Sequence, residues 1–397
     1  MGYYDFDTVI DRKNTDSFKW DMNDELFGSK DVISMWVADM DFACAPQIVE
    51  AVKKRADHPI YGYTVRRKEF VEAVAGWLKK RHSCAVPEEW LAFAPPGVIF
   101  AIHTMLQIIT EKGDKVAVQM PNYDPLFDLV SKAGRKLVEC PIERNPDGEY
   151  NVNIDLFREI ISREKPKAII TSSPHNPTGR VWTREELEKM AEICLENDVF
   201  MIVDEIHADF VAKERNHIAF ASLGEKIAKN SMVCYSANKG FNLGGLQMCS
   251  LIIADDEKRK AFNEQMSIMQ TRLDTAFGVV ATMTAYTDPE CERWLDEAIE
   301  YVEANKRFVS EYLKENCSQI AALATEGTYF AWLNCEKTGM KGRELERFML
   351  ERAGVAFCAG YEFGEAGESY LRMNLACPRS IVEKALRQIT SALNEKR

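Results

Sequence analysis

The sequence predicts an α/β protein with a large domain built on a mostly parallel central sheet, followed by a smaller α+β domain. Three observations lead to this prediction. An apolar run, an amphipathic helix and a second apolar run follow one another between residues 167 and 205. Further short apolar runs occur at 116–120, 231–236 and 249–254. Beyond about residue 290 the pattern changes to a long charged helix followed by isolated strand-like segments.

The segment 167–205 carries the clearest local pattern. KAIITSS is rich in β-branched residues and ends in the turn signal PHNPTG, and VFMIVDE forms a second such run. Between them, Thr183 and Glu186 have the spacing of a helix capping box. Helical spacing then places Leu187, Met190, Ala191, Cys194 and Leu195 on one apolar face. A strand, a helix and a strand in this order predict two parallel strands.

The remaining elements divide the chain into three parts. Residues 49–290 are expected to form the large domain, with a helix at 97–110 after the turn signal PPG. Residues 291–397 are expected to form the small domain, in which a helix near 341–353 lies between TYFAWLNC and the segments VAFCAG and YLRMNLA. Residues 1–48 are expected to be an N-terminal arm that joins the small domain.

Composition excludes several classes of protein. The chain of 397 residues has a formal net charge of −12, which disfavours a nucleic-acid partner. Its 11 cysteines include no C-x-x-C pair and its six histidines no H-x-x-x-H pair, so no metal site is expected. No apolar stretch is long enough to span a membrane, and the N-terminus lacks a signal peptide. A cytoplasmic location is therefore expected.

Polar residues follow several predicted strands at their carboxyl ends, where open α/β sheets bind ligands. Asn122 and Tyr123 follow VAVQM, and Asn176 follows KAIITSS. Asp204 follows VFMIV, and Ser236 to Lys239 follow SMVCY. An aromatic ring, amides, a carboxylate, a hydroxyl and an amine would then meet in one crevice. This set of groups suits a phosphorylated pyridine aldehyde.

Lys239 and Asp204 are the central candidates. A lysine amine forms an imine with an aldehyde once burial or a nearby cation lowers its pKa. The alternative for Lys239 is a solvated loop lysine. A carboxylate at the end of a buried strand needs a cation, and a pyridinium nitrogen is such a cation. The alternative for Asp204 is a helix cap or a turn acid.

The other candidates each have a structural alternative. Asn176 could donate to the ring oxygen or belong to a plain Asn-Pro turn. His207 could serve the same oxygen or pack in the core, and Tyr123 could stack on the ring or only pack. Free N–H groups at a helix start attract phosphate. Such groups are expected at Gly97, Val98 and Ile99, with a hydroxyl from Ser236.

Together these segments resemble a known family. SSPHNPTGRVWTREEL, VDEIHADF, SANKGFNLGG and YLRMNLACPR resemble the class I/II aminotransferases, which are fold type I pyridoxal 5′-phosphate (PLP) enzymes. MWVADMDF at 35–42 and YGYT at 61–64 are similar to the branch of cystathionine β-lyases and cystalysin-type C–S lyases. The resemblance covers residues 3 to 390, nearly the whole chain.

The resemblance implies roles for the candidate residues. Lys239 would be the Schiff-base lysine and catalytic base, Asp204 the partner of the pyridine nitrogen and Asn176 the donor to the ring oxygen. Arg372 would bind the substrate carboxylate as a bidentate fork, where the alternative is a charge on a strand surface. The remaining implied roles are ring stacking by Tyr123, phosphate binding by Gly97, Val98, Ile99 and Ser236, and substrate contact by Val37 and Ala38.

The resemblance also implies a homodimer, in which Tyr63 reaches the phosphate of the neighbouring subunit. Three positions depart from motifs typical of the family. Asn238 and Gly240 stand where these lyases usually have Ser and Thr around the lysine, so hydroxyl donors to the phosphate are missing. Gln247 stands where many transaminases have an arginine, and a glutamine there favours the lyase branch.

The implied reaction is elimination of a thiol from Cβ of an amino acid such as L-cystathionine, with pyruvate and ammonia as the other products. Lys239 would remove the α-proton, and either Lys239 or Tyr123 would protonate the leaving sulfur. An aminotransferase is the alternative, because the same residues serve both reactions. A PLP-binding transcription regulator is disfavoured, because the chain begins almost at the family's N-terminal arm, without a winged-helix extension.

Overall fold

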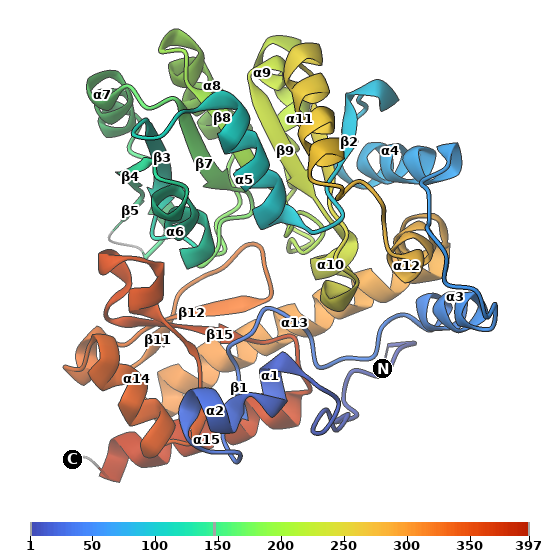
Figure 1. The fold of residues 1–397 in the computed structure, drawn as a ribbon. Coiled ribbons are helices and arrows are strands. Elements are labelled where there is room, and N and C mark those ends of the chain that lie inside the picture. The colour runs from blue at the N-terminus through green and yellow to red at the C-terminus, as the bar shows by residue number, and fades with distance from the viewer. Residues whose placement is uncertain (1, 146–147, 396–397) are drawn as a thin grey trace.

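The computed structural model describes residues 2–145 and 148–395. Two sheets form the frame of the molecule, and Figure 1 shows them in separate layers. The larger sheet has the strand order β2-β10-β9-β8-β7-β3-β4. Its strands are β2 (Leu91–Phe93), β3 (Lys115–Met120), β4 (Lys136–Pro141), β7 (Ala168–Ser172), β8 (Phe200–Asp204), β9 (Ser231–Tyr235) and β10 (Ser250–Ile253).

Four of the six strand pairings in this sheet are parallel, and the two made by β10 are antiparallel. The predicted α/β fold with a mostly parallel central sheet is therefore confirmed. The predicted parallel pair is β7 with β8, in register from Ala168 opposite Phe200 to Ser172 opposite Asp204. The antiparallel direction of β10 was not part of the prediction.

Helices cover both faces of the large sheet, which explains why its strands are apolar without alternation. Along β7 and β8, Ile169 and Met201 pack into one core while Ile170 and Ile202 pack into the other. The flanking helices are α4 (Lys68–His82), α5 (Val98–Ile109), α6 (Asp124–Lys132), α7 (Ile154–Glu164), α8 (Arg184–Glu196), α9 (Glu225–Lys229), α11 (Asp256–Ile268) and α12 (Ala276–Thr287). Helix α8 begins with the predicted capping box of Thr183 and Glu186.

The smaller sheet lies in the C-terminal part of the chain and has the order β11-β12-β15-β14. Its strands are β11 (Ala321–Ala322), β12 (Phe330–Asn334), β14 (Cys358–Ala359) and β15 (Tyr370–Asn374). Around it lie α13 (Pro289–Asn316), α14 (Gly342–Glu351) and α15 (Arg379–Glu395), and Figure 1 shows α13 running beneath the large sheet. A third core joins α13, α15 and this sheet.

The N-terminal segment belongs structurally with this smaller sheet. It contains α1 (Phe18–Asp21), α2 (Asn23–Phe27) and β1 (Ile33–Ser34), and β1 pairs in parallel with β13 (Val355–Ala356). Helix α3 (Pro46–Ala56) then leads towards α12 (Figure 1). The remaining strands, β5 (Glu143–Arg144) and β6 (Tyr150–Asn151), form a small antiparallel pair. The exact domain boundaries at residues 48 and 290 stay predictions.

Within the described residues, no helix combines the length and apolar character needed to cross a bilayer.

Candidate functional site

A cavity of about 230 Å³ opens at the carboxyl ends of β7 and β8. Both central candidates, Asp204 and Lys239, line it together with Asn176. Six further predicted residues in its wall are Ala38, Val98, Ile99, Tyr123, His207 and Ser236. The structure therefore brings most of the predicted site residues into one cavity, although they come from positions more than 200 residues apart.

Lys239 lies on the short helix α10 (Ala237–Gly240), directly after β9. Its amine donates a hydrogen bond to the carbonyl of Ala38, with an Nζ–O distance of 2.7 Å. Burial, and next the positive charge of Arg372, lower the pKa of Lys239 to about 8. The neutral amine, which is the form that attacks an aldehyde, is therefore far more populated near neutral pH than in an exposed lysine.

Asp204 is the last residue of β8, and its side chain is buried. Its Oδ1 accepts a hydrogen bond from the backbone N–H of Ile206 at 3.1 Å. Burial raises the pKa of Asp204 to about 6. An anion at this position is costly without a cation beside it, so the carboxylate favours a positively charged ligand atom in the cavity.

Asn176, in the loop after β7 of the larger sheet, contacts Arg372 on β15 of the smaller sheet. The Nη1 of Arg372 donates to Oδ1 of Asn176 at 3.0 Å. This bond orients the amide, because its oxygen is used by Arg372 and its Nδ2 is left as a donor. Arg372 is only 2% exposed, so it is not the strand-surface charge of the alternative interpretation.

The wall near α5 has the features of an anion site. Gly97 caps α5 with φ 108°, a backbone conformation that residues with a side chain rarely adopt. Val98 and Ile99, the first two residues of the helix, line the cavity. Their backbone N–H groups have no partner within the helix and can bind an anion. Gly97 itself is not part of the wall. Ser236 lines the cavity, but its hydroxyl already donates to the carbonyl of Met248 at 2.5 Å.

The residues around the lysine explain one departure from the family motif. A Cβ at Gly240 would lie 2.9 Å from Oδ2 of Asp209. Asp209 is held in place by the Nε1 of Trp77 at 2.9 Å and the Nε2 of His82 at 2.8 Å. A threonine at position 240 would therefore displace a buried carboxylate with fixed partners. Asn238, the other departure, lines the cavity with an unpartnered buried Oδ1.

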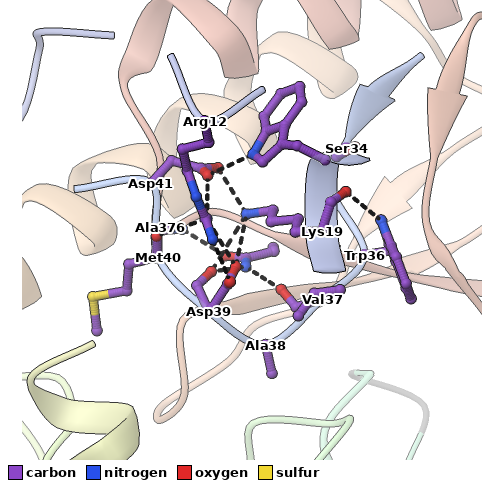
Figure 2. Close-up of polar contacts among 12 residues, drawn as sticks. Arg12, Lys19, Ser34, Trp36, Val37, Ala38, Asp39, Met40, Asp41 and Ala376 are labelled. Carbon is purple, nitrogen blue, oxygen red and sulfur yellow. Dashed lines mark hydrogen bonds and ion pairs between the residues drawn. The ribbon is translucent and has the colours of Figure 1, made fainter. Parts of the chain in front are cut away.

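The N-terminal segment reaches the cavity through Ala38 and is held there by charged side chains. Figure 2 shows this arm cluster, which consists of Arg12, Lys19, Asp39 and Asp41. Lys19 is 1% exposed, and its Nζ lies 2.7 Å from Oδ2 of Asp41. Arg12 lies 2.7 Å from Asp39 and 2.8 Å from Asp41. Two cations and two anions balance one another, so the arm carries buried charge without a net excess.

Amide side chains fix the backbone of the same segment on either side of Ala38. Asn374 donates to the carbonyls of Val37 and Asp39, both at 2.6 Å. The hydroxyl of Tyr329 donates to the Ala38 carbonyl at 2.9 Å, the same oxygen that accepts from Lys239. Val37 thus contributes its backbone carbonyl, which Asn374 holds, and its side chain is not part of the cavity wall.

Arg372, the predicted carboxylate-binding residue, is not part of the cavity wall and reaches it only through its hydrogen bond to Asn176. Three other residues named from the sequence also lie outside the wall. Tyr63 is 94% exposed and does not line this chain's own cavity. Gln247 is exposed, and Asn122 is buried behind the site. Conversely, the wall contains four residues that the sequence analysis did not select. They are Pro96, Ser172, Ile206 and Gly244, and all four stand next to motif residues, which is the only signal that could have indicated them.

The groups in this cavity fit PLP. The buried Nδ1 of His207 and Oδ1 of Asn238 have no hydrogen-bond partner in the described chain, as expected for atoms that face a polar ligand. A low-pKa amine, a carboxylate and the start of a helix lie around the same space. These groups match an aldehyde, a pyridine nitrogen and a phosphate.

Comparison with known proteins identifies the family. The sequence model described as "Aminotransferase class I and II" matches residues 30–389, so the chain belongs to this family. Cystathionine β-lyase PatB of Bacillus subtilis (strain 168) is 37% identical over 98% of this chain and 100% of its own length. Protein MalY of Escherichia coli (strain K12) is 29% identical over 98% of this chain and 99% of its own.

The fold agrees with this assignment. The crystal structure of cystalysin from Treponema denticola, which contains PLP, superposes with a TM-score of 0.95 at 32% identity and covers 99% of this chain and 100% of its own. The PLP-bound C–S lyase from Staphylococcus hominis superposes with a TM-score of 0.90 at 31% identity, covering 98% of each chain. The predicted family and the predicted similarity to the C–S lyase branch are confirmed.

Proposed function

We propose that this protein is a PLP-dependent carbon–sulfur β-lyase that releases a thiol, pyruvate and ammonia from sulfur amino acids such as L-cystathionine. The observation that carries the proposal is the common cavity of Lys239, Asp204 and Asn176. It occurs in a chain that is 37% identical, over its length, to a cystathionine β-lyase. Bound PLP supplies an aldehyde that forms imines with amines and a pyridine ring that accepts electrons.

Residues in and around the cavity have separate roles in binding the cofactor and the substrate. Lys239 holds the cofactor, and the Asp204 carboxylate pairs with the pyridine nitrogen. Asn176 donates its Nδ2 to the ring oxygen, and Tyr123 stacks on the ring; His207 is the second candidate for the ring oxygen. The helix start at Gly97, Val98 and Ile99, with Ser236, binds the phosphate. Arg372 binds the substrate carboxylate, and Val37 and Ala38 border the substrate.

Proton transfer follows from the pKa values of two groups. Lys239, with a pKa of about 8, is a base that can take the α-proton of the substrate near neutral pH. Burial raises the pKa of Tyr123, so its hydroxyl remains protonated. Tyr123 and the protonated Lys239 are thus the two donors available for the leaving sulfur.

The test of this function is a reaction with L-cystathionine in the absence of any 2-oxo acid. We expect continuous formation of pyruvate and thiol over many turnovers. Pyruvate is measured with coupled lactate dehydrogenase and the thiol with a thiol reagent. An aminotransferase is the second candidate, because an aspartate aminotransferase of Pyrococcus abyssi (strain GE5 / Orsay) is 28% identical over 93% of this chain. A single half-turnover, which resumes only when a 2-oxo acid is added, would contradict the lyase and support this alternative.

We also propose a homodimer in which Tyr63 contacts the phosphate in the neighbouring subunit. Around Tyr63, Ile60, Tyr61 and Val65 are each more than 60% exposed, and such apolar exposure is typical of an interface. We expect sedimentation at twice the chain mass and, for Tyr63→Phe, about a tenfold weaker binding of PLP through loss of one hydrogen bond to an anion. A monomer, or an unchanged PLP affinity, would contradict this arrangement.

The expected cytoplasmic location remains part of the proposal. It is supported by the cysteines, because all 11 are present as free thiols, as expected in a reducing compartment.

A further inference from the structure

Arg372 is a buried cation whose hydrogen-bond partners are all uncharged. Among the described residues, none forms an ion pair with it. Its Nη1 donates to Asn176 Oδ1 at 3.0 Å, and its Nη2 donates to the Trp36 carbonyl at 3.1 Å and to Cys358 Sγ at 2.9 Å. Its Nε is buried without a partner. The guanidinium therefore has no ion-pair partner within the described residues, and the carboxyl groups of Asp124 and Glu362 act on it only at longer range.

Cys358 is the partner of Arg372 that is least explained by the proposed function. It lies directly opposite Arg372 in the pairing of β14 with β15. Its thiol accepts a hydrogen bond from Arg372 and donates one to the Trp36 carbonyl at 3.1 Å. Because Arg372 also donates to that carbonyl, the three groups are linked to one another by hydrogen bonds. Nine of the 11 cysteines are buried, whereas Cys358 and Cys44 are half-buried.

The protonation state of this thiol decides what it does to Arg372. Burial raises the pKa of Cys358, although the nearby Arg372 lowers it in part. The thiol is therefore neutral near neutral pH. A neutral acceptor can orient the Nη2 group without cancelling the charge of the guanidinium, whereas a carboxylate at the same place would form an ion pair with it.

We propose that Cys358 is a positioning residue for substrate binding: its uncharged thiol orients Arg372 and leaves the guanidinium charge free for the substrate carboxylate. The inference rests on the proposed role of Arg372 in binding an amino-acid carboxylate. The guanidinium carbon of Arg372 lies 4.2 Å from the ring centroid of Phe330 and 5.1 Å from that of Phe363. These ring contacts do not direct the N–H groups, so the orientation of the guanidinium is set by its hydrogen bonds.

Three substitutions separate orientation from charge. Cys358→Ser retains a neutral group that accepts and donates, and we expect amino-acid affinity within about threefold of wild type. Cys358→Ala removes the acceptor, and we expect affinity to fall about 5- to 10-fold, as for a hydrogen bond to a charged group. Cys358→Asp places an anion on Arg372, and we expect a loss of at least about 100-fold, because the substrate carboxylate then meets a neutralised partner.

The measured quantity is the equilibrium dissociation constant of L-alanine for the PLP-loaded enzyme, determined from the change in cofactor absorbance. L-Alanine has no leaving group at Cβ, so this measurement does not depend on lyase activity. Ethylamine, which is alanine without its carboxylate, is titrated in parallel. A change in orientation of Arg372 lowers the affinity for alanine and leaves that for ethylamine unchanged, whereas general damage to the site lowers both.

Cys44→Ala is the matched control, because it removes the other half-buried thiol and should bind alanine as wild type does. The proposal is overturned if Cys358→Ala and Cys358→Asp bind alanine like wild type, or if they weaken alanine and ethylamine equally. If the wild-type enzyme itself does not prefer alanine to ethylamine, the role of Arg372 is wrong and this inference falls with it. Failure of the lyase assay alone leaves the binding series intact.

Discussion

Lys239→Ala is expected to abolish the imine absorbance of the PLP-loaded protein and to lower kcat by at least about 10⁴-fold. Lys239 is the lysine whose amine lies in the cavity, and two functions depend on it. It is the amine that binds the aldehyde, and it is the base that takes the α-proton. Because one substitution removes both functions, its effect should be the largest of any in the chain.

The absorbance spectrum of the variant with added PLP, and its rate with L-cystathionine, check this prediction. Lys306→Met is the matched control, since Lys306 is also a lysine whose pKa is lowered by burial, but it lies on α13 and pairs with Glu303 at 2.7 Å. The control should retain the absorbance band. A persistent imine band in Lys239→Ala would show that a different amine holds the cofactor.

For Asp204→Asn we expect kcat to fall about 100- to 1,000-fold, the usual cost of removing one preorganised electrostatic partner. Asp204 is the carboxylate among the residues that line the cavity. Its pKa, raised by burial to about 6, indicates that its negative charge is poorly compensated by the protein alone. An amide of the same shape cannot stabilise a proton on the pyridine nitrogen as an anion does.

Steady-state kinetics and a PLP titration of the same variant separate chemistry from binding. We expect the imine band to remain, since Lys239 is intact, and the dissociation constant of PLP to rise. Asp255→Asn serves as the control, because Asp255 caps α11 and asparagine is an equally good cap. An Asp204→Asn variant with kcat within a factor of about three of wild type would refute the pairing with the ring nitrogen.

The site was largely predictable because parallel strands deliver their last residues to one edge of a sheet. Asn176, Asp204 and Lys239 each lie at or just after the carboxyl end of a strand that the apolar pattern indicated, and they line one cavity. Cys358 could not be selected in the same way. Its contact with Arg372 depends on the pairing of β14 with β15, and nothing in the segment VAFCAG indicates which residue will lie opposite it.

Other features of the site depend on distant parts of the chain. The Ala38 carbonyl meets Lys239 across a separation of 201 residues, and the arm cluster that supports it joins residues from three short segments. The sequence analysis found Gly240 to depart from the family motif, but its reason, the Asp209 carboxylate 2.9 Å from a Cβ there, exists only in the folded chain.

The sequence by itself determined the elements, the family and the chemical groups at the strand ends, because these depend on local periodicity, capping and residue type. Tertiary structure alone decided the lowered pKa of Lys239, the uncharged hydrogen-bond partners of Arg372 and the exposure of Tyr63. Each of these depends on burial and on charges from other segments. Desolvation and Coulomb interactions act through space, so their strength is set only when the chain has folded.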